Sequence, residues 1–209
     1  MGYFSQILGG LGITLSVFFV SLALSLPLGL LVALLRLSKI KSVRTLTSFY
    51  IWVLRGTPLL LQIMVIFFGL PQIGIRFDRL PSVYIAFVLN YAAYFGEIFR
   101  SGIQSIERGQ SEAASILGFS HFQTTVKIVL PQVVKRTLPA IGNEVITLVK
   151  DTSLVYPVGL NDILRLTKGI SNRDATLAPY FVAGIVYLAM TYIITELFNR
   201  IEKKVTYEE

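Results

Sequence analysis

Polar and charged side chains recur at helical spacing inside an apolar stretch at residues 82–105. Asn90, Tyr94 and Glu97 lie three or four positions apart and therefore share one face of a helix. Arg100 follows Glu97 by three positions and can flank the same face. Because a carboxylate pairs with an ammonium group and a guanidinium fork with a carboxylate, this face could bind a small zwitterion.

A second polar face is predicted in the apolar stretch at residues 138–158. Glu144, Thr147 and Asp151 share one face, and Leu154 follows close behind them. Two polar faces on neighbouring helices predict a common polar cavity. We therefore take the residues of both faces as candidate substrate-binding residues.

The composition of the chain is that of a membrane protein. Of 209 residues, 54% are hydrophobic and only 15% are charged, whereas a soluble domain has about a quarter of its residues charged. The chain has no cysteine and one histidine, so we expect neither a disulfide framework nor a His/Cys metal site. The basic residues lie in short loops between apolar segments, a pattern typical of membrane orientation and not of nucleic-acid binding.

The apolar segments predict an all-α membrane protein with a single transmembrane domain over residues 1–209. Each segment approaches the ~20 residues that a helix needs to cross a bilayer. The five expected transmembrane helices cover about 11–35, 46–70, 82–105, 138–158 and 178–198. Lys and Arg are concentrated in the first and third loops and the C-terminal tail. Because basic loops stay in the cytoplasm, this predicts an N-terminus outside and a C-terminus inside.

Charges within such segments are expensive and need an explanation. A charged side chain at the centre of a spanning helix costs about 2.5–3.5 kcal/mol on insertion scales, so function is the default explanation. The structural alternative is that Glu97 pairs with Arg100, and Lys150 with a neighbouring acid, as salt bridges that hold helices in register.

The second segment contains a predicted helix break at "RGTPLL". Thr57 can cap a helix and Pro58 can begin one, while the proline disfavours helical geometry at the residue before it. Irregular backbone at membrane depth survives only against protein or a water-filled cavity, so the break could form a pathway wall. Alternatively, a helix starts here at the membrane interface with Arg55 snorkelling.

The long third loop, residues 106–137, predicts two short helices that meet at a glycine. Ser111 can cap the first helix, and Gly118 can end it in the left-handed conformation. Ser120 and Gln123 form a capping box for a second helix that runs into Pro131. Such a corner is either a docking element or a simple connector.

The loop resembles the EAA signature of membrane subunits of bacterial ABC importers. The match within "EAASILGFSHFQTTVKIVLP" consists of Glu112, Ala113, Ala114, Gly118, Ile128, Leu130 and Pro131. The stretches "LLRLSK", "RGTPLL", "YFGEIFRSGIQSI" and "VKDTSLV" extend the resemblance over essentially the whole chain, to the polar amino-acid permeases in particular. In that family the loop supplies coupling helices, so the resemblance implies that Glu112, Ala113, Ala114 and Gly118 contact an ATPase subunit.

The resemblance also implies the partners and the location. We expect the type I importer fold, the bacterial cytoplasmic membrane, two copies of an ATP-binding subunit, a second permease chain of the same or another kind, and an extracytoplasmic amino-acid-binding protein. This chain has no G-x-x-x-x-G-K-[ST] motif, so ATP and Mg²⁺ belong to the partner ATPase and no cofactor is expected here. The segment "GLNDILRLTKGISNRD" predicts a short amphipathic helix that receives the binding protein or packs on the bundle.

The expected function is ATP-driven import of polar, and specifically basic, amino acids. Among the charges inside the spans, Glu97, Glu144 and Asp151 outnumber Arg100 and Lys150 by one, which leaves room for one extra cationic group on the substrate. The first alternative is an ion-coupled secondary carrier that uses the acids as ion sites. The second is an intramembrane enzyme, for which the sequence lacks a nucleophile and base at recognisable spacing.

Overall fold

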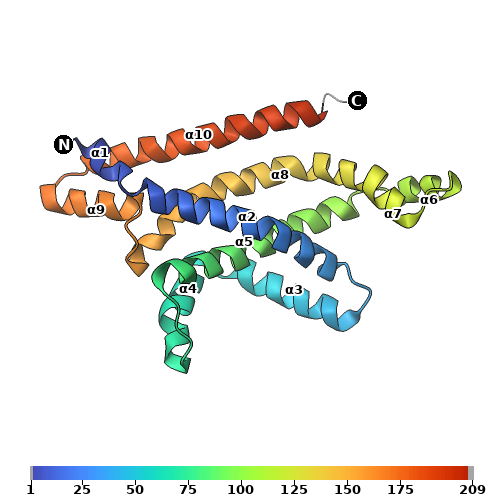
Figure 1. Ribbon diagram of the computed structural model, residues 1–209, viewed down its shortest axis with the longest axis horizontal. Helices are drawn as coiled ribbons and strands as arrows, with labels where there is room; N and C mark the ends of the chain where they lie inside the picture. The colour runs from blue at the N-terminus through green and yellow to red at the C-terminus, as the bar shows by residue number, and fades with distance from the viewer. Residues whose placement is uncertain (1, 207–209) are drawn as a thin grey trace.

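The computed structural model describes residues 2–206 and is helical throughout, with no strand in that range (Figure 1). The α-helices are α1 (Tyr3–Leu8), α2 (Leu11–Arg36), α3 (Lys41–Gly56), α4 (Leu59–Met64), α5 (Arg79–Gln104), α6 (Arg108–Ile116), α7 (His121–Thr124), α8 (Leu130–Asp151), α9 (Ile163–Asp174) and α10 (Ala178–Thr206). Two π-helical turns, η1 (Val65–Gly69) and η3 (Thr125–Val129), and two 3₁₀ helices, η2 (Leu70–Ile73) and η4 (Thr152–Val158), complete the chain.

The long helices α2, α5, α8 and α10 run along the long axis of the molecule (Figure 1). Within residues 2–206, three helical segments are long and apolar enough to cross a membrane: 3–36, 79–104 and 178–205. The pair α3 and α4–η2 qualifies as a fourth if it is one bent span. Helix α8 has the length of a span, but its charged residues keep it out of this class, so the count of five crossings stays a prediction.

Helices α2 and α5 pack closely against each other because glycine faces the partner on each side. A Cβ added at Gly29 would lie 2.7 Å from the Cβ of Phe95, and one added at Gly96 would lie 2.6 Å from a Val32 methyl group. The two backbones therefore approach to a distance that side chains would prevent, as in other membrane helix pairs.

The predicted break in the second segment is confirmed. Thr57 and Pro58 both have extended backbone conformations, and the axes of the helices on either side differ by 104°. Helix α4 and the turns after it thus leave the direction of the bundle (Figure 1). The break is a corner of roughly a right angle with a helix on each side.

The third loop contains the two predicted short helices, with corrected boundaries. Gly118 has φ +80°, in the left-handed region that glycine adopts without strain, and Ser120 and Gln123 form the predicted capping box. The predicted start at Ser111 is wrong, because a further turn of helix fits between the end of α5 and this serine, and α6 begins at Arg108.

The predicted end of the second short helix at Pro131 is also wrong. The chain is helical without interruption from His121 to Asp151, so α8 begins at Leu130, inside the loop predicted for residues 106–137. The π turn η3 changes the hydrogen-bond register directly before the proline. Pro131 follows this π turn closely, and the changed register accommodates a residue without an N–H.

The predicted amphipathic helix after the fourth segment is α9, which packs beside α1 at the N-terminal end of the molecule (Figure 1). Asp162 caps it, accepting hydrogen bonds from the backbone N–H groups of Leu164 at 2.9 Å and Arg165 at 3.1 Å. Burial raises the pKa of the Asp162 carboxyl group, and these two donors oppose the shift. The hairpin α6–α7 and the C-terminal end of α10 lie at the opposite end of the molecule.

The Gly29 contact makes a testable prediction. In Gly29→Ala, the new methyl group must push α2 and α5 apart, so we expect a loss of stability of about 1–3 kcal/mol. The matched control is Gly12→Ala in the same helix, where nothing lies within 4 Å of the added Cβ. Thermal unfolding of the purified protein in detergent should show a lowered midpoint for Gly29→Ala alone. Equal midpoints in the two variants would contradict the close approach.

Candidate functional site

A cavity of about 510 Å³ lies where the broken segment, α5 and α8 meet. Its lining consists of residues from the α3–α4 corner, from the middle of α5, and from the end of α8 with the 3₁₀ helix after it. These residues are Arg55, Gly56, Thr57, Pro58, Leu59, Asn90, Tyr91, Tyr94, Glu144, Thr147, Asp151 and Leu154. The cavity therefore brings together side chains that are up to a hundred residues apart in sequence.

The corner beside the cavity is stabilised by amide side chains. The carbonyl of Leu54 has no α-helical partner, because the residue four positions later is proline, which lacks an N–H. Instead it accepts hydrogen bonds from the amide nitrogens of Asn90 and Gln62, both at 2.9 Å. Asn90 also donates to Oε1 of Gln62 at 3.0 Å, and Gln62 donates to the Thr57 carbonyl at 3.1 Å.

The α8 side of the cavity carries two carboxylates. Asp151 accepts a hydrogen bond at Oδ2 from the hydroxyl of Tyr91, at 2.8 Å. Glu144 lies about two helical turns before Asp151 on the same helix and is partly buried. Among residues 2–206, neither carboxylate forms an ion pair, and Glu144 has no hydrogen-bond partner. Two negative groups thus face the cavity without a bound counter-charge.

The positive group of the cavity is Arg55, which the sequence analysis did not select as a binding residue. Its guanidinium carbon lies 5.0 Å from the centre of the Tyr94 ring, in cation–π contact. The signal was present in "RGTP": a break directly after an arginine in the last turn of a helix places that side chain at the corner. Tyr91 was missed because it lies one position off the polar face of α5.

Six of the eight predicted binding residues line this cavity. They are Asn90, Tyr94, Glu144, Thr147, Asp151 and Leu154. Glu97 and Arg100 do not line it, and here the structure differs from the prediction. The two side chains form an ion pair three residues apart on α5, beyond Tyr94 towards the hairpin end. Lys150 is exposed and also lies outside the lining.

The hairpin α6–α7 presents an apolar tip to its surroundings. Ile116, Leu117 and Phe122 expose 87%, 74% and 76% of their surface. Of the residues predicted to contact the ATPase, Glu112, Ala113 and Gly118 are exposed. Ala114 is only 1% exposed and packs inside the hairpin, so its small size serves the contact between α6 and the following helix.

The side chains of the cavity determine which kind of ligand it can bind. In the part of the chain that the structure describes, no three His, Cys, Asp or Glu residues come together as a metal site would require. The arrangement can instead bind a charged solute through one guanidinium, two carboxylates and hydroxyl groups.

Comparison with known families identifies the class of protein. Residues 25–207 match the family described as binding-protein-dependent transport system inner membrane component. The chain belongs to this family, whose members are the membrane-spanning permease subunits of ABC transporters.

Similar permease proteins match nearly the whole chain. It is 40% identical to the arginine transport system permease protein ArtQ of Bacillus subtilis (strain 168), over 95% of this chain and 91% of the relative. It is 34% identical to the L-cystine transport system permease protein TcyB of the same organism, over 94% and 85% of the two chains. A crystal structure of an amino acid ABC transporter with histidines superposes with a TM-score of 0.89, at 34% identity and over 97% and 95% of the two chains.

A more distant structure supports the fold alone. The MetNI methionine ABC transporter in an inward-facing conformation gives a TM-score of 0.71 at 20% identity, over 96% of this chain and 94% of that one. The arrangement of helices is therefore that of the ABC permease fold.

The hydrogen bonds at the corner make a second prediction. Gln62→Leu removes two donors to backbone carbonyls and one acceptor for Asn90, so we expect a loss of stability of about 1–3 kcal/mol. The control is Gln72→Leu, an exposed glutamine beyond the corner. Hydrogen exchange of residues 53–64, measured by mass spectrometry, should become faster in Gln62→Leu only. Unchanged exchange would show that the amide does not stabilise the corner.

Proposed function

We propose that this chain is the membrane subunit of an ATP-driven importer of basic amino acids. The cavity at the α3–α4 corner is the proposed substrate site. The permease breaks no covalent bond; it offers the solute a route, and a partner ATPase supplies the energy.

The observation that carries this proposal is the charge of the cavity lining. Arg55 contributes one positive charge, and Glu144 and Asp151 contribute two negative charges. A basic amino acid has the complementary set: one carboxylate and two cationic groups. Arg55 can hold the α-carboxylate in a two-pronged hydrogen bond, while the two acids receive the ammonium and side-chain cations. Asn90, Tyr94, Thr147 and Leu154 complete the wall of the site.

The cost of burying charge explains why a net negative cavity would favour a cationic substrate. Two partly buried carboxylates with one cation are unfavourable in a low-dielectric interior unless a further cation joins them. A basic amino acid supplies that cation and leaves site and solute neutral together. The arginine permease ArtQ and the transporter solved with histidines, both similar to this chain, are consistent with such a substrate.

Coupling to ATP hydrolysis is proposed to run through the hairpin α6–α7. The hairpin exposes one charged residue, Glu112, and two small residues, Ala113 and Gly118. Its exposed apolar residues, Ile116, Leu117 and Phe122, provide further contact area. Because Gly118 fixes the angle between α6 and α7, closure of two ATPase subunits would move the hairpin as a rigid body. That movement would switch the cavity between outward and inward access.

The remaining parts of the assembly follow from the same proposal. A second permease chain pairs with this one, and an extracytoplasmic binding protein delivers the solute at the α1–α9 end. The hairpin and the C-terminal end of α10 both lie towards the other end of the molecule, which agrees with a C-terminus inside and an N-terminus outside (Figure 1).

Substitutions in the cavity test the assignment of the substrate. In the purified complex with its ATPase, we expect Asp151→Asn and Glu144→Gln to weaken binding of arginine by on the order of tenfold or more, because each removes a charge-assisted hydrogen bond. Arg55→Gln should weaken binding of every amino acid, since all of them carry the α-carboxylate. Titration calorimetry with arginine, glutamine and glutamate measures these affinities.

The control is Glu107→Gln, which removes an exposed carboxylate before the hairpin. Its arginine affinity should equal that of the unsubstituted complex. If the three cavity variants also bind arginine normally, the cavity is not the substrate site. If uptake into sealed vesicles proceeds without ATP and stops when the ion gradient is removed, the chain is an ion-coupled carrier instead.

A further inference from the structure

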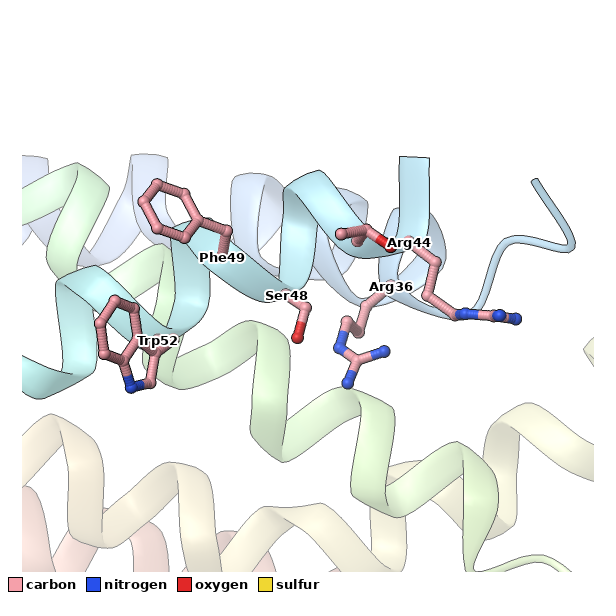
Figure 2. A pocket seen from close by; sticks show the side chains of 6 residues that line it. Arg36, Arg44, Ser48, Phe49 and Trp52 are labelled. Carbon is pink, nitrogen blue, oxygen red and sulfur yellow. The ribbon is translucent and has the colours of Figure 1, made fainter. Parts of the chain in front are cut away.

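A second pocket, of about 480 Å³, lies beside the turn between α2 and α3 (Figure 2). It is lined by Arg36, Arg44, Thr45, Ser48, Phe49 and Trp52. Arg36 ends α2, and the other five residues come from the first three turns of α3. In Figure 2 the side chains of Arg36, Ser48 and Trp52 point to the same side of α3. Two guanidinium groups, two hydroxyls and two aromatic rings thus surround one space.

The positive charge at this pocket is not balanced within the chain. The first acidic residue of the sequence is Asp78, so no carboxylate lies anywhere in α1, α2 or α3. Among residues 2–206, neither Arg36 nor Arg44 forms an ion pair or a hydrogen bond through its side chain. Glu97 is within electrostatic range of Arg36, but it is already paired with Arg100.

The start of α3 adds to this imbalance. Helix N-termini carry a partial positive charge and favour acidic side chains, yet the first turn of α3 contains Lys41 and Arg44 and no acid. Its N-cap residue, Ile40, makes no side-chain capping hydrogen bond. The helix dipole and the basic side chains near the start of α3 therefore both favour an anion beside the pocket.

Along α3, the aromatic residues of the pocket lie further from the α2–α3 turn than Arg44 does. Trp52 is eight residues after Arg44, or about 12 Å along the helix. Trp52 exposes 70% of its surface, Phe49 58% and the neighbouring Leu46 71%, and the Trp52 and Phe49 rings are 5.9 Å apart. Basic groups followed by aromatic and aliphatic groups match the order of headgroup, interface and acyl chain in a lipid leaflet.

We propose that this pocket binds an anionic phospholipid: Arg36, Arg44, Thr45 and Ser48 hold the phosphate, and the acyl chains lie along Phe49 and Trp52. A soluble phosphate would use the polar groups but not the exposed rings. An ATPase subunit is also a poorer occupant, because the hairpin α6–α7 projects further along the long axis than the α2–α3 turn (Figure 1). The proposal is independent of which solute the chain transports.

Trp52 is the only tryptophan of the chain and reports on the pocket directly. The complex with its ATPase is reconstituted in mixtures of phosphatidylcholine and phosphatidylglycerol. In one set of samples the phosphatidylglycerol carries bromine on its acyl chains, and in a second set the phosphatidylcholine carries it, so that the brominated lipid quenches tryptophan fluorescence. The fluorescence that is lost in Trp52→Phe gives the Trp52 contribution. We expect phosphatidylglycerol to be preferred at Trp52 by on the order of tenfold, as two arginines near a lipid phosphate would produce.

The double variant Arg36→Gln, Arg44→Gln should abolish the preference, and Arg36→Lys, Arg44→Lys should retain part of it and show that the site still folds. The matched control, Lys39→Gln and Lys41→Gln, removes the same charge from the same turn outside the pocket and should keep the preference.

Four results would overturn the proposal. If the arginine-to-glutamine and lysine-to-glutamine double variants lose the lipid preference equally, the attraction is diffuse and there is no site. Equal quenching by both lipids would indicate no selectivity. The absence of quenching would mean that another protein subunit covers the pocket. Loss of the preference in millimolar inorganic phosphate would make soluble phosphate the ligand.

Discussion

The fold depends on how the backbone groups freed at the α3–α4 corner are satisfied. Pro58 leaves the Leu54 carbonyl without a helical partner, and a bilayer offers no water to replace it. Asn90 on α5 and Gln62 on α4 donate to this carbonyl instead, both at 2.9 Å. The corner is therefore stabilised by two amide side chains, one from α4 itself and one from the neighbouring helix α5.

The cavity is a consequence of this corner. A straight second span would place Arg55 on the side of a helix, whereas the break leaves it at the helix end, stacked on Tyr94 and opposite the acids of α8. The same amide that satisfies the corner, Asn90, also forms part of the cavity wall. Charge in the site and irregularity in the backbone are thus coupled, as expected where non-helical backbone faces a polar space.

Local signals in the sequence predicted much of this arrangement. Helical spacing placed Asn90, Tyr94, Glu144 and Asp151 on two facing helices, because periodicity depends only on nearby residues. The proline predicted the break, and glycine with a capping box predicted the hairpin. The features that the sequence analysis did not predict depend on tertiary contacts.

The position of Glu97 and Arg100 outside the cavity could not be predicted for this reason. Spacing cannot show that a pair on one face is satisfied internally, and it cannot show which way a corner turns. Arg55 was missed because its role exists only once the helix breaks by 104°. The end predicted at Pro131 failed because the π turn before it keeps the helix continuous.

The most direct test of the account is a cryo-EM map of the complete transporter with arginine bound. The account predicts density for one arginine between Arg55 on one side and Glu144 and Asp151 on the other, with the corner at Thr57–Pro58 intact. Arginine bound elsewhere, with this cavity closed and its acids paired to other side chains, would contradict it.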